Sequence, residues 1–423
     1  MASNSSDNHH DVVIIGAGII GVAIASHLQA AGRRVLLIDR KGICAETSAR
    51  NAGALAFSDI LPLASPGILR RAPGWLLDPL GPLAIRPTYL PHILPWLIRF
   101  AMASRRGPFE AAAAAQARLM TLARDEFHSM LARIGASSMI HRDGSLELYE
   151  SEAQFHAAEP GWACRREAGI DFEHVRGERL ADLQPGLAKS IVAATYVPQW
   201  ETVGDPFTVT TTIGQHVLDH GARLLVDEVR GISPAADQVQ VLLTQQPALT
   251  CGQVVIAAGA WSRALTTPLG DTIPLDTERG YNTTLPRHAF DLRRQLIFSA
   301  HGFVATPLDS GIRIGGAVEF GGLTLPADFR RSDAMLATAK RLLPALQTTG
   351  GTQWMGFRPS LPDSLPVIDF SPASRRVAYA FGHGHLGLTQ SGATARLITD
   401  LLLNRKPAID PSAFRANRFN PRR

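Results

Sequence analysis

The chain has 423 residues, of which 45% are hydrophobic and 19% are charged, a composition typical of an ordered protein with a substantial core. This length exceeds that of a usual single domain, so we expect two domains. The formal net charge of +5 is mildly basic, and no dense block of Lys or Arg occurs, so nucleic acid is not an expected partner.

Cysteine usage and the first residues indicate a cytoplasmic protein. Cys44, Cys164 and Cys251 are irregularly spaced, which favours a reducing compartment over a disulfide framework. No CxxC pair or Cys/His cluster has the spacing of metal ligands, so we expect no metal site. The opening residues, MASNSSDNHH, are polar and lack the apolar core of a signal peptide.

Residues 11–40 predict a strand, a glycine-rich turn, a helix and a second strand. The apolar runs at 12–15 and 35–38 are typical of buried parallel strands. We expect a helix over 19–30, ended by Gly32. The acidic residue that a dinucleotide-binding unit needs follows the second strand.

The turn between these strands predicts a dinucleotide site rather than an empty tight turn. Gly16 permits the bend, Gly18 lets the backbone approach a pyrophosphate, and Gly21 lets the helix pack closely on the strand. The helix N-terminus offers N–H groups to the phosphates, and Asp39 can accept hydrogen bonds from a ribose. The residues expected at this end of the cofactor are Gly16, Gly18, Ile19, Ile20, Gly21, Asp39 and Arg40.

A polar loop of small residues, GICAETSARNAG at 42–53, follows the second strand. It has neither helical nor strand periodicity, and its small residues suit contact with phosphates or a ring system. The expected cofactor contacts are Thr47, Ser48, Asn51, Ala52 and Gly53. An ordinary surface loop is the alternative.

Residues 60–103 are rich in Leu, Trp and Pro. The prolines exclude a continuous transmembrane helix, and no uninterrupted apolar run approaches the roughly 20 residues needed to span a bilayer. One interpretation is a cover packed on the protein, which the residues alone favour. The other is a membrane-interface surface, with side chains at headgroup level that include Trp75, Trp96, Arg99, Arg105 and Arg106.

Further along, helices are expected over 109–135, over 151–168 with an interruption at Pro160, and from about 205. Residues 221–232 predict one strand, and we expect Val229 on this strand to lie near the adenine of the cofactor. A buried strand over 254–257 stops at a glycine, as a segment passing close to a ligand would. The expected contacts here are Val229, Ala258, Gly259 and Trp261.

Residues 273–318 alternate in polarity, which predicts an antiparallel sheet as the floor of a substrate domain. Near the C-terminus, the loop GHGHLGLT at 382–389 leads into a helix over 389–403. Its N–H groups and helix dipole would stabilise the negative charge of a reduced flavin, which favours FAD over a nicotinamide cofactor. The expected contacts are Gly384, His385, Leu386, Gly387, Leu388 and Thr389.

Three residues are candidates for contact with a substrate. Arg358, in GFRPSLPD, has a planar fork that suits a carboxylate, with a structural ion pair as the alternative. Tyr281 either lines the pocket or is a buried structural tyrosine. His385 either reaches substrate or flavin or is a satisfied loop histidine. Arg279 either contributes to contact with the substrate or is a surface charge, and a surface charge is the expectation.

Together these motifs resemble the FAD-dependent D-amino acid dehydrogenases, within the wider D-amino acid oxidase group. The resemblance runs through VVIIGAGIIGVAIA, ETSARNAG, VVIAAGAW, RGYNTTLP, RIGGAVEF, GFRPSLPDSLPVI and GHGHLGLTQSGATARLITDLL. It implies an α/β fold with a Rossmann-type FAD-binding domain and an inserted, mainly antiparallel α+β substrate domain. The FAD-binding domain would comprise 1–85, 205–272 and 355–423, and the substrate-binding domain 86–204 and 273–354.

The resemblance also implies site roles. Arg358 would bind the substrate carboxylate, Tyr281 would border the site, and residues 384–389 would contact the isoalloxazine. No cysteine lies near Gly356, where relatives with covalent flavin attach it, so FAD is expected to be non-covalent.

Relatives of this branch oxidise D-amino acids, including cyclic imino acids such as cis-4-hydroxy-D-proline, and pass electrons to a quinone rather than oxygen. Some are membrane-associated, which adds weight to a peripheral contact of residues 72–103 with the inner face of the cell membrane. Two alternatives stay open. One is an oxygen-using oxidase of glycine, sarcosine or another secondary amine, and the other is a flavoprotein subunit of a larger amine dehydrogenase complex.

Overall fold

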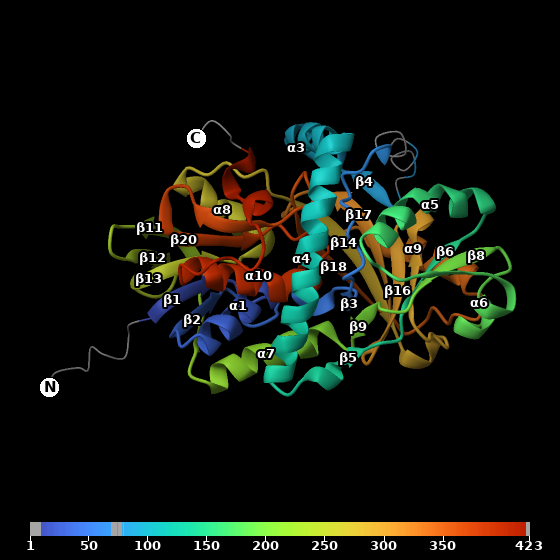
Figure 1. Ribbon diagram of the computed structural model, residues 1–423, viewed down its shortest axis with the longest axis horizontal. Coiled ribbons are helices and arrows are strands. Elements are labelled where there is room, and N and C mark those ends of the chain that lie inside the picture. The colour runs from blue at the N-terminus through green and yellow to red at the C-terminus, as the bar shows by residue number, and fades with distance from the viewer. Residues whose placement is uncertain (1–9, 69–73, 75–77, 79, 420–423) are drawn as a thin grey trace.

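The computed structural model describes residues 10–68, 74, 78 and 80–419. It contains two large sheets side by side, and the long helix α4 (Arg106–Arg133) runs across the junction between them (Figure 1). A small sheet of three strands joins the two halves. Its members are β3 (Ala54–Leu55), β5 (Ile140–His141) and β9 (Glu201–Val203).

The first sheet carries the glycine-rich motif. Parallel pairing links β10 to β2, β2 to β1, β1 to β13 and β13 to β20, while β11, β12 and β19 are antiparallel additions. Its strands are β1 (His10–Ile15), β2 (Val35–Asp39), β10 (Arg223–Val226), β11 (Val229–Pro234), β12 (Val239–Leu243), β13 (Leu249–Ile256), β19 (Val367–Ser371) and β20 (Ser374–Phe381). The continuous apolar runs of β1 and β13 are buried because both faces of this sheet are covered.

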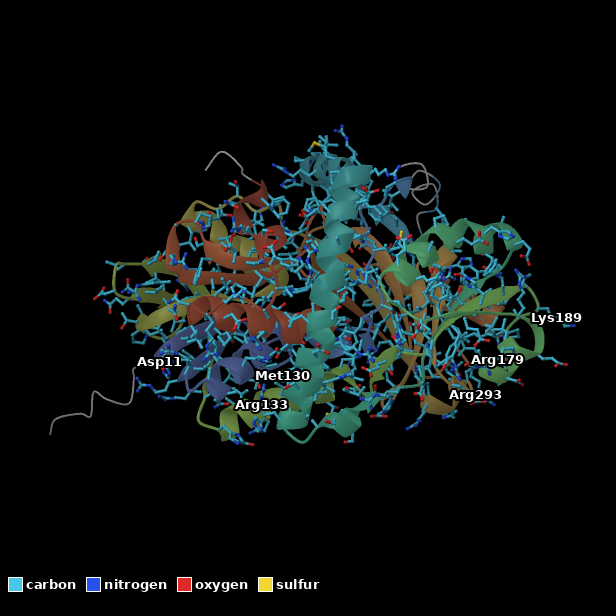
Figure 2. All side chains as sticks on the ribbon, viewed as in Figure 1. Asp11, Met130, Arg133, Arg179, Lys189 and Arg293 are labelled. Carbon is cyan, nitrogen blue, oxygen red and sulfur yellow. The ribbon has the colours of Figure 1, made fainter. Side chains whose placement is uncertain are left out.

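Helices cover one face of the first sheet and share a single core with it. They are α1 (Ile19–Ala30), α4, α7 (Pro206–Asp219) and α10 (Gly387–Leu402). Helix α7 begins where it was expected, and Asp205 caps it by accepting a hydrogen bond from the Thr208 N–H. Met130, labelled near one end of α4 in Figure 2, is fully buried in this core. The short helix α8 (Ser262–Thr266) follows β13.

The second sheet is mainly antiparallel, in the order β18-β14-β17-β16-β15-β6-β8-β7, and β4 pairs with β17. Its strands are β4 (Leu83–Ile85), β6 (Ser145–Tyr149), β7 (Glu173–Val175), β8 (Ala193–Val197), β14 (Asp276–Leu285), β15 (Gln295–Phe298), β16 (Phe303–Leu308), β17 (Gly311–Phe320) and β18 (Thr352–Ser360). The associated helices are α3 (Leu90–Ala103), α5 (Glu152–Glu167), α6 (Gly177–Leu183) and α9 (Arg330–Leu342). The basic side chains of Arg179, Lys189 and Arg293 lie at the end of this sheet that is distant from α4 (Figure 2).

This architecture confirms the predicted fold class, and three local predictions were wrong. The helix over 151–168 is continuous as α5, with Pro160 inside it. The single strand over 221–232 is two strands, β10 and β11, because Asp227 turns the chain by accepting hydrogen bonds from the N–H groups of Gln245 and Gln246. The last long helix begins at Gly387, two residues earlier than expected.

The predicted domain division stays a prediction, and two strands and one helix cross it. β18 spans the boundary at 354/355 but pairs along its length with β14. β4 falls within the 1–85 segment but pairs with β17 of the second sheet. α4 falls within the 86–204 segment but shares the core of the first sheet.

Residues 80–103 pack on the protein through one face of α3. Ile93 and Trp96 are buried against Phe320, which supports the packed cover. Large apolar side chains on the opposite face are 46–54% exposed, namely Leu90, Leu94, Ile98 and Met102. Among the described residues, no helix combines the length and apolarity required to cross a membrane. Trp75 and residues 72–73 lie outside the described residues.

Candidate functional site

A cavity of about 920 Å³ is lined by residues of both large sheets. It brings together most of the residues that the sequence singled out: Gly16, Gly18, Ile19, Ile20, Asp39, Arg40, Thr47, Ser48, Asn51, Ala52, Val229, Ala258, Gly259, Trp261, Tyr281, Arg358, Gly384, His385, Leu386, Gly387, Leu388 and Thr389. Gly21 and Gly53 lie behind the wall instead. A Cβ on Gly21 would stand 1.9 Å from the Gly16 carbonyl oxygen, so this glycine serves helix packing.

The glycine-rich turn is held in a form that only glycine tolerates. Gly16 has a φ of +106°, and a Cβ there would lie 2.4 Å from the Ala257 carbonyl oxygen. The Asp39 carboxylate accepts hydrogen bonds from the N–H groups of Ala17 (2.9 Å) and Lys41 (2.8 Å). Asp39 therefore braces the turn, and its contact with a ribose stays a prediction.

The loop after β2 bridges the two sheets at the cavity. The Ile19 N–H, at the start of α1, donates to Ser48 Oγ (3.0 Å). Thr47 Oγ1 donates to the carbonyl oxygen of Phe357 on β18 (2.9 Å). Arg313 Nη1, from β17, donates to the Asn51 carbonyl oxygen (2.6 Å). Side chains on this loop thus fix the distance between the helix start and the second sheet.

The loop before α10 joins the same wall. The Gly384 N–H donates to the carbonyl oxygen of Pro359 (2.7 Å), and Gly384 has a φ of +56°. Thr389 Oγ1 donates to the Ala54 carbonyl oxygen (3.2 Å), which ties the start of α10 to β3. Burial lowers the pKa of His383 to about 3, so this imidazole is neutral at pH 7.

Arg358 places its guanidinium at the cavity wall. Nη1 donates to the Ala317 carbonyl oxygen (3.0 Å) and Nη2 to that of Gly316 (3.3 Å). A Cβ on Gly280 would lie 2.4 Å from Nη2, so a larger residue there would displace the guanidinium from this position. Within the described part of the chain, no carboxylate lies within 4 Å of it. Burial lowers the pKa of Arg358, and the Glu278 carboxylate partly opposes this.

Several charged lining residues were missed by the sequence interpretation, namely Glu46, Arg50, Asp59, Asp227, Glu228, Glu278 and Arg313. Arg313 interrupts the apolar strand GIRIGGAVEF, which is a signal that would have found it, whereas Glu278 stands between Asp276 and Arg279 and gives no such signal. Burial lowers the pKa of Arg313 to about 10, with Asp205 opposing the shift. Arg313 stays cationic at pH 7 and holds the Asn51 backbone in place.

Tyr281 contacts the cavity wall, but its hydroxyl is already engaged. The residue is 1% exposed. Its hydroxyl donates a hydrogen bond to Glu319 Oε2 (2.5 Å) and accepts one from the Asp328 N–H (3.1 Å). We therefore assign the hydroxyl no contact with the carboxylate of a substrate. The expectation that Arg279 is a surface charge was wrong, because Arg279 is fully buried. Its guanidinium donates to the carbonyl oxygens of Gly322, Leu325 and Pro326.

His385 lines the cavity beside Asp59. Its Nε2 lies 3.4 Å from Asp59 Oδ2, and Arg165 Nη2 lies 3.4 Å from the other carboxylate oxygen. Burial raises the pKa of the Asp59 carboxyl, but the hydrogen bonds from His385 and Arg165 outweigh this and lower it below its ordinary value. His385 is therefore positioned by a carboxylate that is ionised at neutral pH.

Comparison with known proteins gives the family. A family model described as FAD dependent oxidoreductase matches residues 11–401. The chain belongs to this family. It is 33% identical to a D-amino-acid oxidase of Bradyrhizobium diazoefficiens over 96% of this chain and 98% of that protein. It is 30% identical to a D-amino acid dehydrogenase of Rhizobium rhizogenes over 96% and 99% of the two chains.

Solved structures share the fold at lower identity. The glycine oxidase of Geobacillus kaustophilus superposes with a TM-score of 0.75 at 20% identity, covering 97% of this chain and 99% of that chain. The L-proline dehydrogenase of P. horikoshii gives a TM-score of 0.74 at 19% identity, covering 98% of each chain. These likenesses confirm the fold and carry no argument about the substrate.

FAD is the cofactor of this oxidoreductase, and the cavity fits it. The turn at Gly16–Gly18 and the start of α1 suit the pyrophosphate, while the start of α10 suits the flavin ring, and both line one cavity. When bound, the flavin supplies the hydride acceptor. Neither Cys44, Cys164 nor Cys251 lines the cavity, so non-covalent binding stays the expectation.

Proposed function

We propose that this protein oxidises D-amino acids. The substrate would lose a hydride from Cα, and the resulting imino acid would hydrolyse to a keto acid and ammonia. The observation that carries the proposal is Arg358, a partly buried cation on the cavity wall that forms no ion pair within 4 Å with a carboxylate of the described residues. The names of the relatives, a D-amino-acid oxidase and D-amino acid dehydrogenases, support the substrate class.

In this proposal the chain binds and orients the substrate. The fork of Arg358 accepts the carboxylate, because a guanidinium offers parallel N–H donors that match two carboxylate oxygens. Its own bonds to the carbonyl oxygens of Ala317 and Gly316 fix the fork's direction. The loop at 384–389 closes the same region through the Gly384 bond to Pro359. Positioning of this kind does much of the work in hydride transfer.

The test is a panel of D- and L-amino acids, glycine, sarcosine and cyclic imino acids, mixed with the FAD-loaded protein without oxygen. We expect D-amino acids to bleach the flavin's visible absorbance, and the L-enantiomers to leave it unchanged. Bleaching by glycine and sarcosine alone would instead establish the secondary-amine oxidase. If no single compound bleaches the flavin, the alternative of a subunit in a larger complex replaces the proposal.

We also propose that cyclic D-imino acids are substrates and that a quinone accepts the electrons. The resemblance to the dehydrogenase branch motivates both points, whereas the relative named D-amino-acid oxidase favours oxygen as the acceptor. Reduced protein would be mixed with air or with a soluble quinone analogue. Slow reoxidation in air that quickens with the quinone supports the dehydrogenase. Rapid peroxide formation in air contradicts it.

We further propose a peripheral membrane contact through the outer face of α3, on the inner side of the cell membrane. Its apolar side chains recur every four residues and so form one stripe, comprising Leu90, Leu94, Ile98 and Met102. Arg105 and Arg106 follow at the end of the helix and suit anionic headgroups. Flotation with anionic vesicles should capture the protein, and the Leu94→Ser, Ile98→Ser double variant should float less. Equal flotation of both would contradict this contact.

A further inference from the structure

We propose that Glu278 binds the amino group of the substrate whose carboxylate is bound by Arg358. This inference rests on the proposed function and assigns the second half of substrate recognition. It begins with the register of the second sheet, in which Glu278 of β14 stands directly opposite Arg358 of β18 in an antiparallel pair. Directly opposed residues project from the same face of a sheet, with Cβ atoms about 4.5–5.5 Å apart. Both residues line the cavity.

The two faces of β14 differ in how their charged side chains are paired, as Arg279, the next residue after Glu278, shows. Arg279 projects to the opposite face, where it lies 3.5 Å from Glu319 and donates to three backbone carbonyl oxygens. Every charge on that opposite face of β14 is therefore matched within the protein. Glu278 and Arg358 differ, because their charges face the cavity.

Neither of these cavity-facing charges is neutralised by an ion pair. Glu278 is 4% exposed, and its hydrogen-bond donor is the Ser360 hydroxyl at 2.6 Å from Oε1. In the described residues no Lys, Arg or His nitrogen lies within 4 Å of its carboxylate. The Arg358 guanidinium extends over Gly280 to the carbonyl oxygens of β17, and so points away from Ser360. Glu278 nevertheless acts on Arg358, since its carboxylate raises the Arg358 pKa against the effect of burial.

Glu278 is buried and Arg358 is partly buried. Two such opposite charges that are near each other yet form no ion pair are costly, because each has lost contact with water without gaining a full partner. A ligand that carries both complementary charges would satisfy them together. An α-amino acid has this form, with a carboxylate and an amino group on one carbon. The Glu278 carboxylate can accept an N–H hydrogen bond from an ammonium, a neutral amine or a ring imino group. A carboxylic acid without the amino group would pair with Arg358 but be repelled by Glu278.

The test uses the FAD-loaded protein with D-alanine and D-phenylalanine, and with their des-amino counterparts, propanoate and 3-phenylpropanoate. The amino acid Kd comes from the concentration dependence of anaerobic flavin reduction, and the acid Kd from competition. We expect Glu278→Gln to weaken amino acid binding about 10- to 100-fold, while the acids bind equally or more tightly. Arg358→Met should weaken both classes. Glu278→Asp, which keeps the charge, should recover part of the amino acid affinity.

Glu319→Gln is the matched control, since it makes the same change on the opposite face of the sheet, and it should not separate the two ligand classes. Equal weakening of both classes by Glu278→Gln, or no change in amino acid affinity, would overturn the assignment. If Glu278→Gln does not retain FAD, the role of Glu278 is tested with the wild-type protein alone, by comparing its affinities for D-alanine and propanoate. Propanoate that binds as tightly as D-alanine contradicts a role for Glu278. Failure of the proposed function is a different result, namely wild-type flavin that no D-amino acid reduces.

Discussion

Arg279 of β14 and Arg358 of β18 lie on paired strands of one sheet, yet their surroundings differ, because Arg279 is fully buried and Arg358 is partly buried on the cavity wall. Arg279 lies against Glu319 and three carbonyl oxygens on the face of β14 that is turned from the cavity. Arg358 projects from the cavity face and has two carbonyl oxygens but no carboxylate partner among the described residues. The same side chain therefore stabilises the fold at one position and is available to a ligand at the other.

The face behind the cavity is a connected network. Glu319 accepts from the Tyr281 hydroxyl, lies near Arg279 and forms an ion pair with Arg86, the residue before the turn that leads into α3. This network joins β14, β17 and the segment that covers the cavity. The difference between the two faces is that the charges behind the cavity are matched within the protein, whereas those of Glu278 and Arg358 are not, and this difference is what the proposed roles of Glu278 and Arg358 rest on.

The largest expected effect is on stability, at Arg279. Arg279→Met leaves Glu319 and the carbonyl oxygens of Gly322, Leu325 and Pro326 without this donor. We expect a loss of about 3–5 kcal/mol in the free energy of unfolding, as for other broken buried pairs. Urea unfolding followed by circular dichroism measures it. A variant as stable as the wild type would remove the distinction between the two faces.

The next effect is on binding, at Arg358. Arg358→Met should weaken D-amino acid binding by about 2–5 kcal/mol, which is about 30- to 4,000-fold in Kd, because the carboxylate loses its only expected cation. The free energy of unfolding should stay within about 1 kcal/mol of the wild-type value, since no protein carboxylate loses a partner. Anaerobic flavin reduction and urea unfolding of the same sample separate these quantities. Near-normal affinity would remove Arg358 from the substrate site.

The residues that predicted the cofactor site are those whose role is local. Gly16 needs its positive φ within one turn, and the βαβ unit that surrounds it follows from hydrophobic runs and glycine spacing alone. The loop at 384–389 likewise predicts a flavin contact from its own residues, because it is rich in glycine and leads directly into a helix. Such features could be predicted because the physical reason for each lies within a few residues of the chain.

The roles of Arg279, Tyr281 and Glu278 could not be predicted in the same way. Which face each side chain takes depends on the pairing of β14 with β17, and the register of that pair shifts between Arg279 and Tyr281. A bulge of this kind leaves no pattern in RGYNT itself. The partner that neutralises Arg279 is Glu319, 40 positions away, so burial of the arginine follows from tertiary structure.

Substitution of Tyr281 should have a smaller effect, and it tests whether the hydroxyl contacts the network behind the cavity or the substrate. Tyr281→Phe removes one donor to the buried Glu319 carboxylate and the acceptor of the Asp328 N–H. We expect a loss of about 1–3 kcal/mol in the free energy of unfolding. The KM for D-amino acids should change less than about 2-fold, a shift of about 0.4 kcal/mol. A stable variant with a strongly raised KM would place the hydroxyl on the substrate instead.

Asp59 should give the smallest effect, because its charge is shared with partly exposed partners at the cavity edge. Hydrogen bonds from His385 and Arg165 hold the pKa of Asp59 below its ordinary value despite burial. A depressed folded pKa stabilises the protein above the unfolded value of about 3.9, and the stabilisation is lost as the pH falls through the lower folded value. Asp59→Asn should therefore cost about 1 kcal/mol at pH 7 and progressively less below about pH 4. Urea unfolding at both pH values measures the difference. A deficit that persists undiminished in acid would show that the charge of the carboxylate is not what stabilises this corner, and that Asp59 acts through packing and neutral hydrogen bonds, unlike Arg279, whose charge is matched by Glu319.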